Sequence, residues 1–547
     1  MTPRTHPPRW ANECLDRRQW LERVAFSTTG TTVLWGGFSG CAVTPPAAQQ
    51  GWISPSWRSP WSDEDRLYRL VNRATWGANG ADLARASELG AAQWVRMQLQ
   101  PPAPAADQDG LPTWVQDRIQ AMTISRLPLD GLMSEMEALR RAQDAAVGEE
   151  PRRVAQQRYQ RELGRLIRET ASRHVWRALH SPYPVREHMT WFWFNHFNVH
   201  QFKANLRAMV GDYEERAIRP HALGRFRDLL GAVMHHPAML RYLDNEQNAV
   251  SRPNENLGRE LLELHTLGVD SIYTQRDVQE LSRILTGHGL NLTNNSPRLR
   301  PEAQGLYRRT GLYEFNPARH DFGAKTLLGQ TLQGRGAVEL DEALDILARH
   351  PHTARHISRK LVTFFLGDAP QPALTQRLAR TFIEKDGHIG QVLEVMFLDP
   401  AFTASGAPNF KDPMHFVLSG VRAAHEGHTV LNTVPVQTWL NRLGQGLYNR
   451  QTPDGYPLAS DAWNASGQMA TRFEIARQMA SSAAGLFKPE DPAWGAEQPG
   501  MPQLATPTFH RYVQGQLRSS TRDILASATV PRDWNALYLS SPDFMAR

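Results

Sequence analysis

Two histidines stand at a spacing that could bind a metal ion. His196 and His200 lie four residues apart in the aromatic run Trp191–His200, so on a helix they would share one face and could chelate one metal. A zinc protease also needs a glutamate directly after the first histidine, and Phe197 stands there, which excludes that activity. The alternative is structural: the run is apolar nearly all round, which predicts a buried helix with hydrogen-bonded core histidines.

The segment from Asn254 to Gly268 is predicted to be one helix, because asparagine is a good N-cap and glycine a good C-cap. At about 100° per residue, its apolar side chains form one stripe towards the core. That stripe consists of Leu257, Leu261 and Leu264. The helix would hold the acidic residues between them at defined angles to the core.

Glu260 and Glu263 lie close enough on this helix to share a ligand, and His196 could complete a divalent metal site with them. His265 lies about 160° from Glu263 around the helix, and the Glu-x-x-His spacing of carboxylate metal sites is absent. The alternative is that Glu260 pairs with a buried arginine while Glu263 is solvated. A metal bound by His196, Glu260 and Glu263 is therefore one of two hypotheses.

His320 and Asp321 form a third candidate site, followed by Phe322 and Gly323. Asp-Phe-Gly also occurs in protein kinases, but no glycine-rich loop, strand lysine or catalytic-loop motif accompanies it here. A kinase is thereby excluded, and we expect the two residues to be polar site residues on a loop.

A mainly α, multi-helix body over residues 63–547 must position these groups. Apolar residues recur at helical spacing through most of it, and its length favours two packed lobes. Residues 133–180 are predicted to be long, charged, partly exposed helices that elaborate the core. Residues 286–336 contain few helix formers and predict an irregular excursion with a β-hairpin.

The composition limits the function classes. The net charge of +6 over 547 residues is too small to argue for nucleic acid, and no basic cluster is interleaved with aromatics. No apolar stretch is long enough to span a membrane. The two cysteines, Cys14 and Cys41, both lie near the N-terminus, so no internal disulfide would remain after cleavage at Cys41.

The first 62 residues are expected to be an export signal followed by a tether. Arg17 and Arg18 begin a segment that resembles a twin-arginine export motif, and residues 38–41 resemble a lipobox ending in the lipidation residue Cys41. We therefore expect residues 1–40 to be a signal and residues 41–62 a flexible tether. The alternative is a plain signal peptide cut within residues 42–48.

Several segments of the body together carry a recognisable pattern. They are residues 70–77, 193–198, 242–244, 254–268, 273–275, 277–278, 285–287, 320–323, 347–365, 444–457 and 540–544. This pattern resembles the signature of an uncharacterised bacterial family catalogued as domain of unknown function 1800, over roughly residues 63–547. His200 is not part of it. The resemblance implies a largely helical, often exported protein, but no activity. It also implies a partner, because members are often encoded beside a second exported family, catalogued as 1501, which resembles alkaline-phosphatase-like hydrolases.

Two functions remain open at this level. The first is a lipoprotein of the cell envelope, lipid-anchored at the outer membrane or periplasmic, which binds or scaffolds an exported partner. The second is a metal-dependent envelope enzyme that uses some of the histidines and acids named above. A glycan-binding surface is a third reading because the chain has 16 tryptophans, although core packing explains most of them equally well. Convergence of the candidate residues in one cleft would favour the enzyme, and ion pairing with arginine the scaffold.

Overall fold

Helices form where the sequence places apolar residues at helical spacing, and the first helix shows how. In α2 (Asp63–Ala74), Leu70, Val71 and Ala74 are buried on one side. Ser62 caps the helix, because its hydroxyl accepts from the Asp65 amide while the Asp65 carboxylate accepts from the Ser62 amide. The computed structural model describes residues 62–101, 109–269, 271–293, 295–404, 409–482, 485–490, 495 and 501–547. The predicted export arginines, the lipidation cysteine and the predicted tether up to residue 61 lie outside these ranges.

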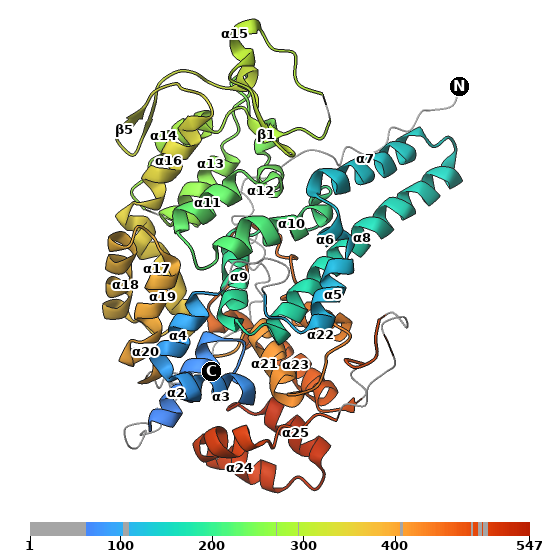
Figure 1. Cartoon of the computed structure of the whole chain (residues 1–547), viewed down its shortest axis with the longest axis vertical. Helices are drawn as coiled ribbons and strands as arrows, with labels where there is room; N and C mark the ends of the chain where they lie inside the picture. Colours follow the sequence, from blue (N-terminus) through green and yellow to red (C-terminus); the bar gives the residue numbers. More distant parts are fainter. Residues whose placement is uncertain are drawn as a thin grey trace, which may run out of the picture. The chain divides into compact units, whose positions relative to one another are not determined.

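The first half of the described chain is almost entirely helical (Figure 1). The opening helices are α2, α3 (Gly80–Leu89), α4 (Ala91–Leu99), α5 (Thr113–Ala121), α6 (Thr123–Arg126), α7 (Leu129–Ala145), α8 (Glu149–His180) and α9 (Pro184–His196). Shorter turns follow: η1 (Leu206–Ala208), α10 (Val210–Asp212), η2 (Tyr213–Ile218), η3 (Arg219–His221), α11 (Phe226–Met234), α12 (Pro237–Tyr242), η4 (Asn245–Gln247), α13 (Asn256–Glu260), η5 (Leu261–Thr266) and α14 (Gln275–Ile284). Of these, η2 and η5 are π-helices.

The predicted excursion contains two small antiparallel sheets. Strands β1 (His288–Leu290), β2 (Arg308–Thr310) and β3 (Tyr313–Phe315) pair in the order β1-β3-β2, and β4 (Lys325–Leu327) pairs with β5 (Gln330–Leu332). Between them lie the short helices α15 (Pro301–Gln304) and η6 (Pro317–Arg319). The irregular excursion with a β-hairpin is thus confirmed, and it lies beside α14 and α16 at one end of the folded unit (Figure 1).

The remainder of the chain returns to helices. These are α16 (Val338–Ala348), α17 (Pro351–Leu366), α18 (Pro372–Glu384), α19 (Ile389–Phe397), α20 (Pro400–Ala404), α21 (Pro413–Ala424), α22 (Val434–Arg442), η7 (Ser460–Trp463), α23 (Ser466–Met479), η10 (Phe509–Val513), η11 (Gln514–Gln516), α24 (Ser519–Ala526) and α25 (Pro531–Ser540). The prediction of a mainly α fold is confirmed. Among the described residues, no helix is both long and apolar enough to cross a membrane.

A charged hairpin is made by α7 and the first half of α8, which run side by side away from the other helices (Figure 1). Its exposed faces carry intrahelical ion pairs, including Arg140 with Glu137 and Arg153 with Glu150. From Thr170 onward α8 is buried. The charged elaboration predicted over residues 133–180 therefore ends as a core helix.

One continuous hydrophobic core joins these elements. It includes side chains from α2 through α25, with one small satellite formed by Leu111, Val115, Ile119, Met122 and Trp176. Residues 59–547 form one compact unit, so the two packed lobes expected from chain length are not present as separate units in the described part. Helix α2 packs against elements of the second half of the chain, which ties the two halves of the described part into one core.

The first described helix packs against elements from the second half of the chain. Helix α2 packs against α17, α20 and η10. The Arg73 guanidinium donates to the Phe402 carbonyl, and the Tyr68 ring stacks on Tyr512 with centroids 5.6 Å apart. A short antiparallel bridge joins Phe410 to Ala546.

Candidate functional site: a histidine–lysine cluster

The aromatic helix α9 is buried along its whole length, as the sequence predicts for a helix that is apolar all round. Pro184 occupies its first turn, where a missing amide hydrogen costs nothing. The helix ends at His196, so His200 lies beyond it in irregular backbone. The two histidines therefore do not share a helix face, and the chelate suggested by their spacing does not form.

The segment 254–268 is not a single α-helix, which corrects the prediction. Helix α13 begins at Asn256, because Asn254 accepts from the Asn256 amide through its side chain two residues before the helix. At Leu261 the backbone changes to the π-helix η5, whose wider turn alters the angle of every following side chain. Leu262 is consequently fully buried, whereas Leu264 is only half-buried.

Three imidazoles and one ammonium group meet where α9, η5 and α17 converge. The Lys360 Nζ donates to His196 Nδ1 at 2.8 Å, and His196 Nε2 donates to the His265 carbonyl oxygen at 3.1 Å. The His265 and His356 rings lie 5.8 and 6.2 Å from the His196 ring. His356 Nε2 donates to the Leu264 carbonyl at 3.3 Å. We call His196, His265, His356 and Lys360 the histidine–lysine cluster.

These contacts fix the protonation state of His196. One ring nitrogen donates to a carbonyl and the other accepts from an ammonium group, so the ring is neutral with its hydrogen on Nε2. Burial and the Lys360 charge lower the pKa of His196 well below its ordinary value. Burial also lowers the pKa of Lys360, to about 8. Both ring nitrogens of His196 are thus engaged, and neither is left for a metal.

The predicted acidic ligands do not join this cluster. Glu263 pairs with Arg259 at 3.4 Å, and the same arginine pairs with Glu255 at 3.0 Å. Glu263, which was expected to be solvated, therefore has an arginine partner. Within the described ranges, no group of three histidine, cysteine, aspartate or glutamate residues could hold a metal ion. The proposed ligand set of His196, Glu260 and Glu263 is thus not assembled.

His320 and Asp321 lie elsewhere, in contact with the start of α16. His320 Nε2 lies 3.0 Å from Glu339 Oε1, and the Lys325 Nζ lies 2.5 Å from Glu339 Oε2, with all three side chains buried. Asp321 pairs with Arg283 at 2.8 Å. Both predicted residues are polar and on a loop, as expected, but they hold the excursion against α14 and α16.

Two asparagines of α9 and its end bind the loop of residues 448–457. The Asn195 side chain donates to the Tyr456 carbonyl at 2.9 Å and accepts from its amide at 2.6 Å. Asn198 donates to the carbonyls of Arg450 and Thr452 at 3.0 and 2.8 Å. Gly455 has φ +75°, and a Cβ there would lie 2.0 Å from the Asn195 carbonyl oxygen. The loop therefore lies directly over the end of α9 and requires this glycine.

Sequence reasoning missed His356 and Lys360, although a signal was present. They lie four residues apart in α17, and so on one helix face, within the segment 347–365 that carries part of the family pattern. Only the fold shows that this face meets His196.

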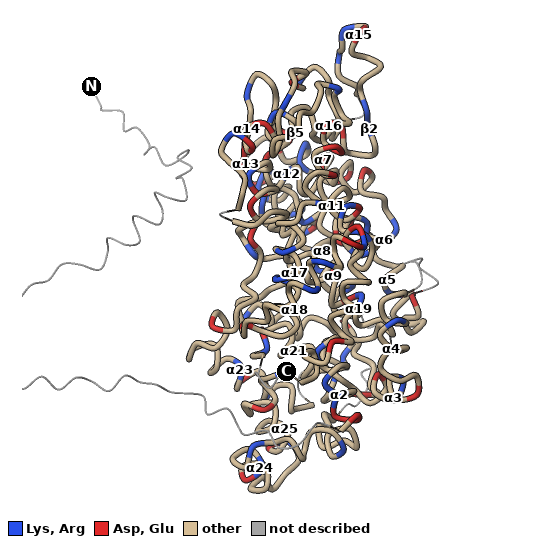
Figure 2. Tube along the Cα trace, turned by 90° about the vertical axis from the view of Figure 1, so that its left-hand side faces the viewer, with Lys and Arg blue, Asp and Glu red and all other residues tan. Residues whose placement is uncertain are grey.

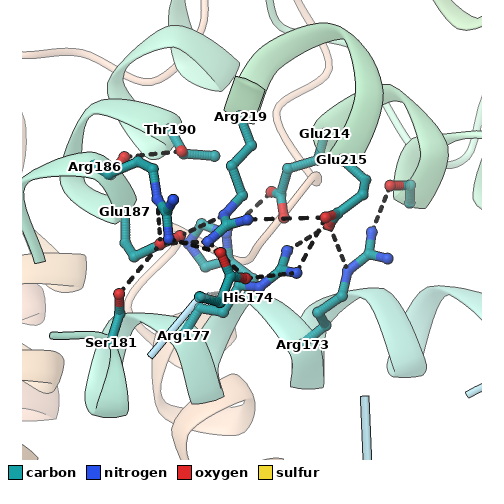
Figure 3. Close-up of polar contacts among 12 residues, drawn as sticks. Arg173, His174, Arg177, Ser181, Arg186, Glu187, Thr190, Glu214, Glu215 and Arg219 are labelled. Atoms are coloured by element: carbon teal, nitrogen blue, oxygen red, sulfur yellow. Dashed lines mark hydrogen bonds and ion pairs between the residues drawn. The ribbon is translucent and has the colours of Figure 1, made fainter. Parts of the chain in front are cut away.

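A second feature that sequence reasoning missed is a buried ion network (Figure 3). Arg173, Arg177, Arg186 and Arg219 pair there with Asp109, Glu187 and Glu215, and the neighbouring Glu214 pairs with His174. Arg219 donates to both Glu187 oxygens, at 3.0 and 2.8 Å. Burial alone would raise the pKa of Glu187, but Arg219 and Arg186 outweigh it and hold that pKa below its ordinary value. The two arginines therefore keep this buried carboxylate charged.

The protein is mainly α, and its histidine–lysine cluster is held by hydrogen bonds where α9, η5 and α17 converge. A family model described as "Protein of unknown function (DUF1800)" matches residues 69–546, so the chain belongs to this family. The resemblance found in the sequence is thereby confirmed. No curated protein and no solved structure matches the chain.

Proposed function

We propose that the protein is an exported, lipid-anchored binding or scaffold protein of the cell envelope. One observation carries this proposal: two of the three candidate catalytic acids are already held in ion pairs. Glu263 pairs with Arg259, and Asp321 pairs with Arg283. A catalytic acid or base must be able to reach a substrate, whereas groups paired in this way stabilise the elements that carry them.

The metal-dependent alternative is weakened by the chemistry of His196. A metal ligand needs a free lone pair, and the Nδ1 lone pair accepts the Lys360 ammonium hydrogen while Nε2 carries the donated hydrogen. Binding a metal here would require Lys360 to move away and the ring to give up its bond to the His265 carbonyl.

The proposed partner is an exported hydrolase-like protein of the family catalogued as 1501. This part rests on the family to which the chain belongs. Basic and acidic residues are interspersed along the described elements (Figure 2). The proposed anchor is a lipid on Cys41, and the proposed export signal contains Arg17 and Arg18.

The proposed export signal and lipid anchor can be tested with two variants of the full chain. Changing both Arg17 and Arg18 to lysine is expected to leave uncleaved precursor in the cytoplasm, because the twin-arginine receptor recognises the arginine pair. Cys41→Ser is expected to move the protein from the membrane fraction to the soluble fraction, because one lipid anchor is lost. Normal export of the first variant, or unchanged membrane partitioning of the second, would contradict the proposal.

The binding function is tested with the exported hydrolase-like protein from the same genome. Cross-linking in intact cells, followed by purification of the tagged partner, should recover this chain at near-stoichiometric yield. An unrelated tagged lipoprotein is the control and should recover none. Elemental analysis of protein purified without chelator separates the alternatives: stoichiometric metal that is lost in His196→Ala or Glu260→Gln would establish the metal-dependent enzyme instead.

A further inference from the structure

A pocket of about 450 Å³ lies between the start of α3, the end of α8 and the turn that follows α21. Its floor is formed by buried apolar residues such as Leu179 and Val430, and its rim includes the exposed Arg85 and His428. This volume falls within the range of small-molecule sites, which is about 300–1,000 Å³. None of the residues discussed for the histidine–lysine cluster lines it.

His425 lines this pocket without any hydrogen-bond partner. Its side chain belongs to a residue that is only 4% exposed, and both ring nitrogens are buried and unpartnered among the described residues. The buried Nε2 of His180, another residue that lines the pocket, is also unpartnered among the described residues. Burying a polar group without a partner is costly, so such groups commonly mark a place where something else binds.

The charges around the pocket cancel. Asp82 pairs with Arg422, whose other N–H groups donate to the carbonyls of Gly77, Ala178 and Leu179. On the rim, Arg85 is balanced by Glu426. Burial lowers the pKa of His180 and of His425 to about 4, so both rings are neutral at pH 7. The pocket therefore offers no net charge to a ligand.

Neutral imidazoles suit hydroxyl groups in particular. A neutral imidazole has one N–H donor and one nitrogen acceptor; His425 has both without a partner and His180 has its Nε2, and a ligand hydroxyl can both accept and donate a hydrogen bond. The half-buried Trp114 also lines the pocket, and an aromatic ring gives an apolar contact to the carbon face of a sugar. We infer that this pocket binds a neutral polyhydroxylated molecule, the size of a mono- or disaccharide, through His180, His425 and Trp114. This site is independent of the partner proposed above.

The inference is tested by calorimetry on the folded protein with glucose, N-acetylglucosamine and maltose. Glucuronate and glucosamine provide a charged anion and a charged cation of similar shape. At least one neutral sugar should bind, and the charged analogues should bind about tenfold more weakly because their charge has no counterion in the pocket. Binding of charged analogues alone, or no binding by any sugar, would overturn the inference.

His425→Leu is the decisive variant, because binding and folding move in opposite directions. Leucine leaves no unpartnered nitrogen, so the melting temperature should stay equal or rise, while sugar affinity should fall at least about tenfold. His415→Leu is the matched control: His415, near the start of α21, is also buried but is bonded to Asp412, so this variant should lose stability. Retained affinity in His425→Leu would overturn the inference. His180→Leu, expected to weaken binding likewise, provides a second reading.

Free sugars and the ends of glycan chains share this chemistry, and a co-sedimentation arm separates them. Insoluble polysaccharide should retain the wild-type protein, and free sugar should release it, if chain ends are the source. Calorimetric binding without sedimentation identifies a soluble saccharide. Both results support the pocket, whereas sedimentation that persists in His425→Leu contradicts it.

Discussion

Glu187 is a carboxylate out of contact with water, and two arginines keep it charged. Arg219 and Arg186 lie within hydrogen-bonding distance of it, and all three side chains are at least 95% buried. Removing one partner of such a pair leaves an uncompensated buried charge. We therefore expect Arg219→Met to lower the free energy of unfolding by about 3–5 kcal/mol, measured by urea denaturation.

The matched control for this prediction is Arg153→Met in the charged hairpin. Arg153 also pairs with a glutamate, Glu150, but both side chains are more than half exposed. Exposed pairs contribute about 0–1 kcal/mol, so this variant should be nearly silent. Equal losses from the two variants would show that the network is hydrated rather than buried.

At the scale of single elements, the change from α13 to the π-helix η5 decides which leucines are buried. The α-helical pattern predicted Leu257, Leu261 and Leu264 as the core stripe, and the first two are indeed fully buried. After Leu261 the wider turn buries Leu262 and His265 instead. Local sequence periodicity assumes one turn width, so it could predict the helix and its first half but not this change.

This register gives a direct test by alanine substitution. Leu262→Ala should cost about 2–5 kcal/mol of unfolding free energy, as Leu261→Ala should, because both side chains are fully buried. Leu264→Ala should cost clearly less, because Leu264 is half-buried. A larger loss from Leu264→Ala than from Leu262→Ala, in the same denaturation series, would show a continuous α-helix.

The candidate site was predictable only in part. The sequence indicated His196 and His265 as polar residues on apolar helices, and the structure brings them together. It did not indicate Lys360, because pairing between α9 and α17 joins residues 164 positions apart. The partner of Glu263 was missed for a different reason. Arg259 lies one helical turn before Glu263, but the metal hypothesis considered only groups that could share a ligand.

Across the whole molecule, buried neutral histidines couple stability to pH. Burial lowers the pKa of His180, His356, His415 and His425 to about 4 and that of His265 to about 3. In the unfolded chain a histidine titrates near pH 6.5. Between these values the unfolded state binds more protons, so stability is full above about pH 6.5 and falls as the pH drops towards 4.

We therefore expect the free energy of unfolding to fall steeply between pH 6.5 and 4.5, by up to about 1.4 kcal/mol per pH unit for each such histidine. Urea denaturation at half-unit steps measures this. The buried glutamates do not produce the same window: their pKa values are lowered below about 4.5, so their contribution is lost only at more acidic pH. Constant stability from pH 7 to 5 would show that these histidines are protonated or exposed in the folded protein.

The packing of α2 against the last part of the chain also sets an order of events during biosynthesis. Arg73 donates to the carbonyl of Phe402, which lies 329 residues later in the chain. Tyr68 stacks on Tyr512, which lies more than 400 residues later. At about 5–20 residues per second, the ribosome needs on the order of half a minute or longer to supply these partners. Until then the apolar face of α2 is open and available to chaperones. Helix α2 therefore completes its packing only after Tyr512 has been synthesised, late in translation of the chain.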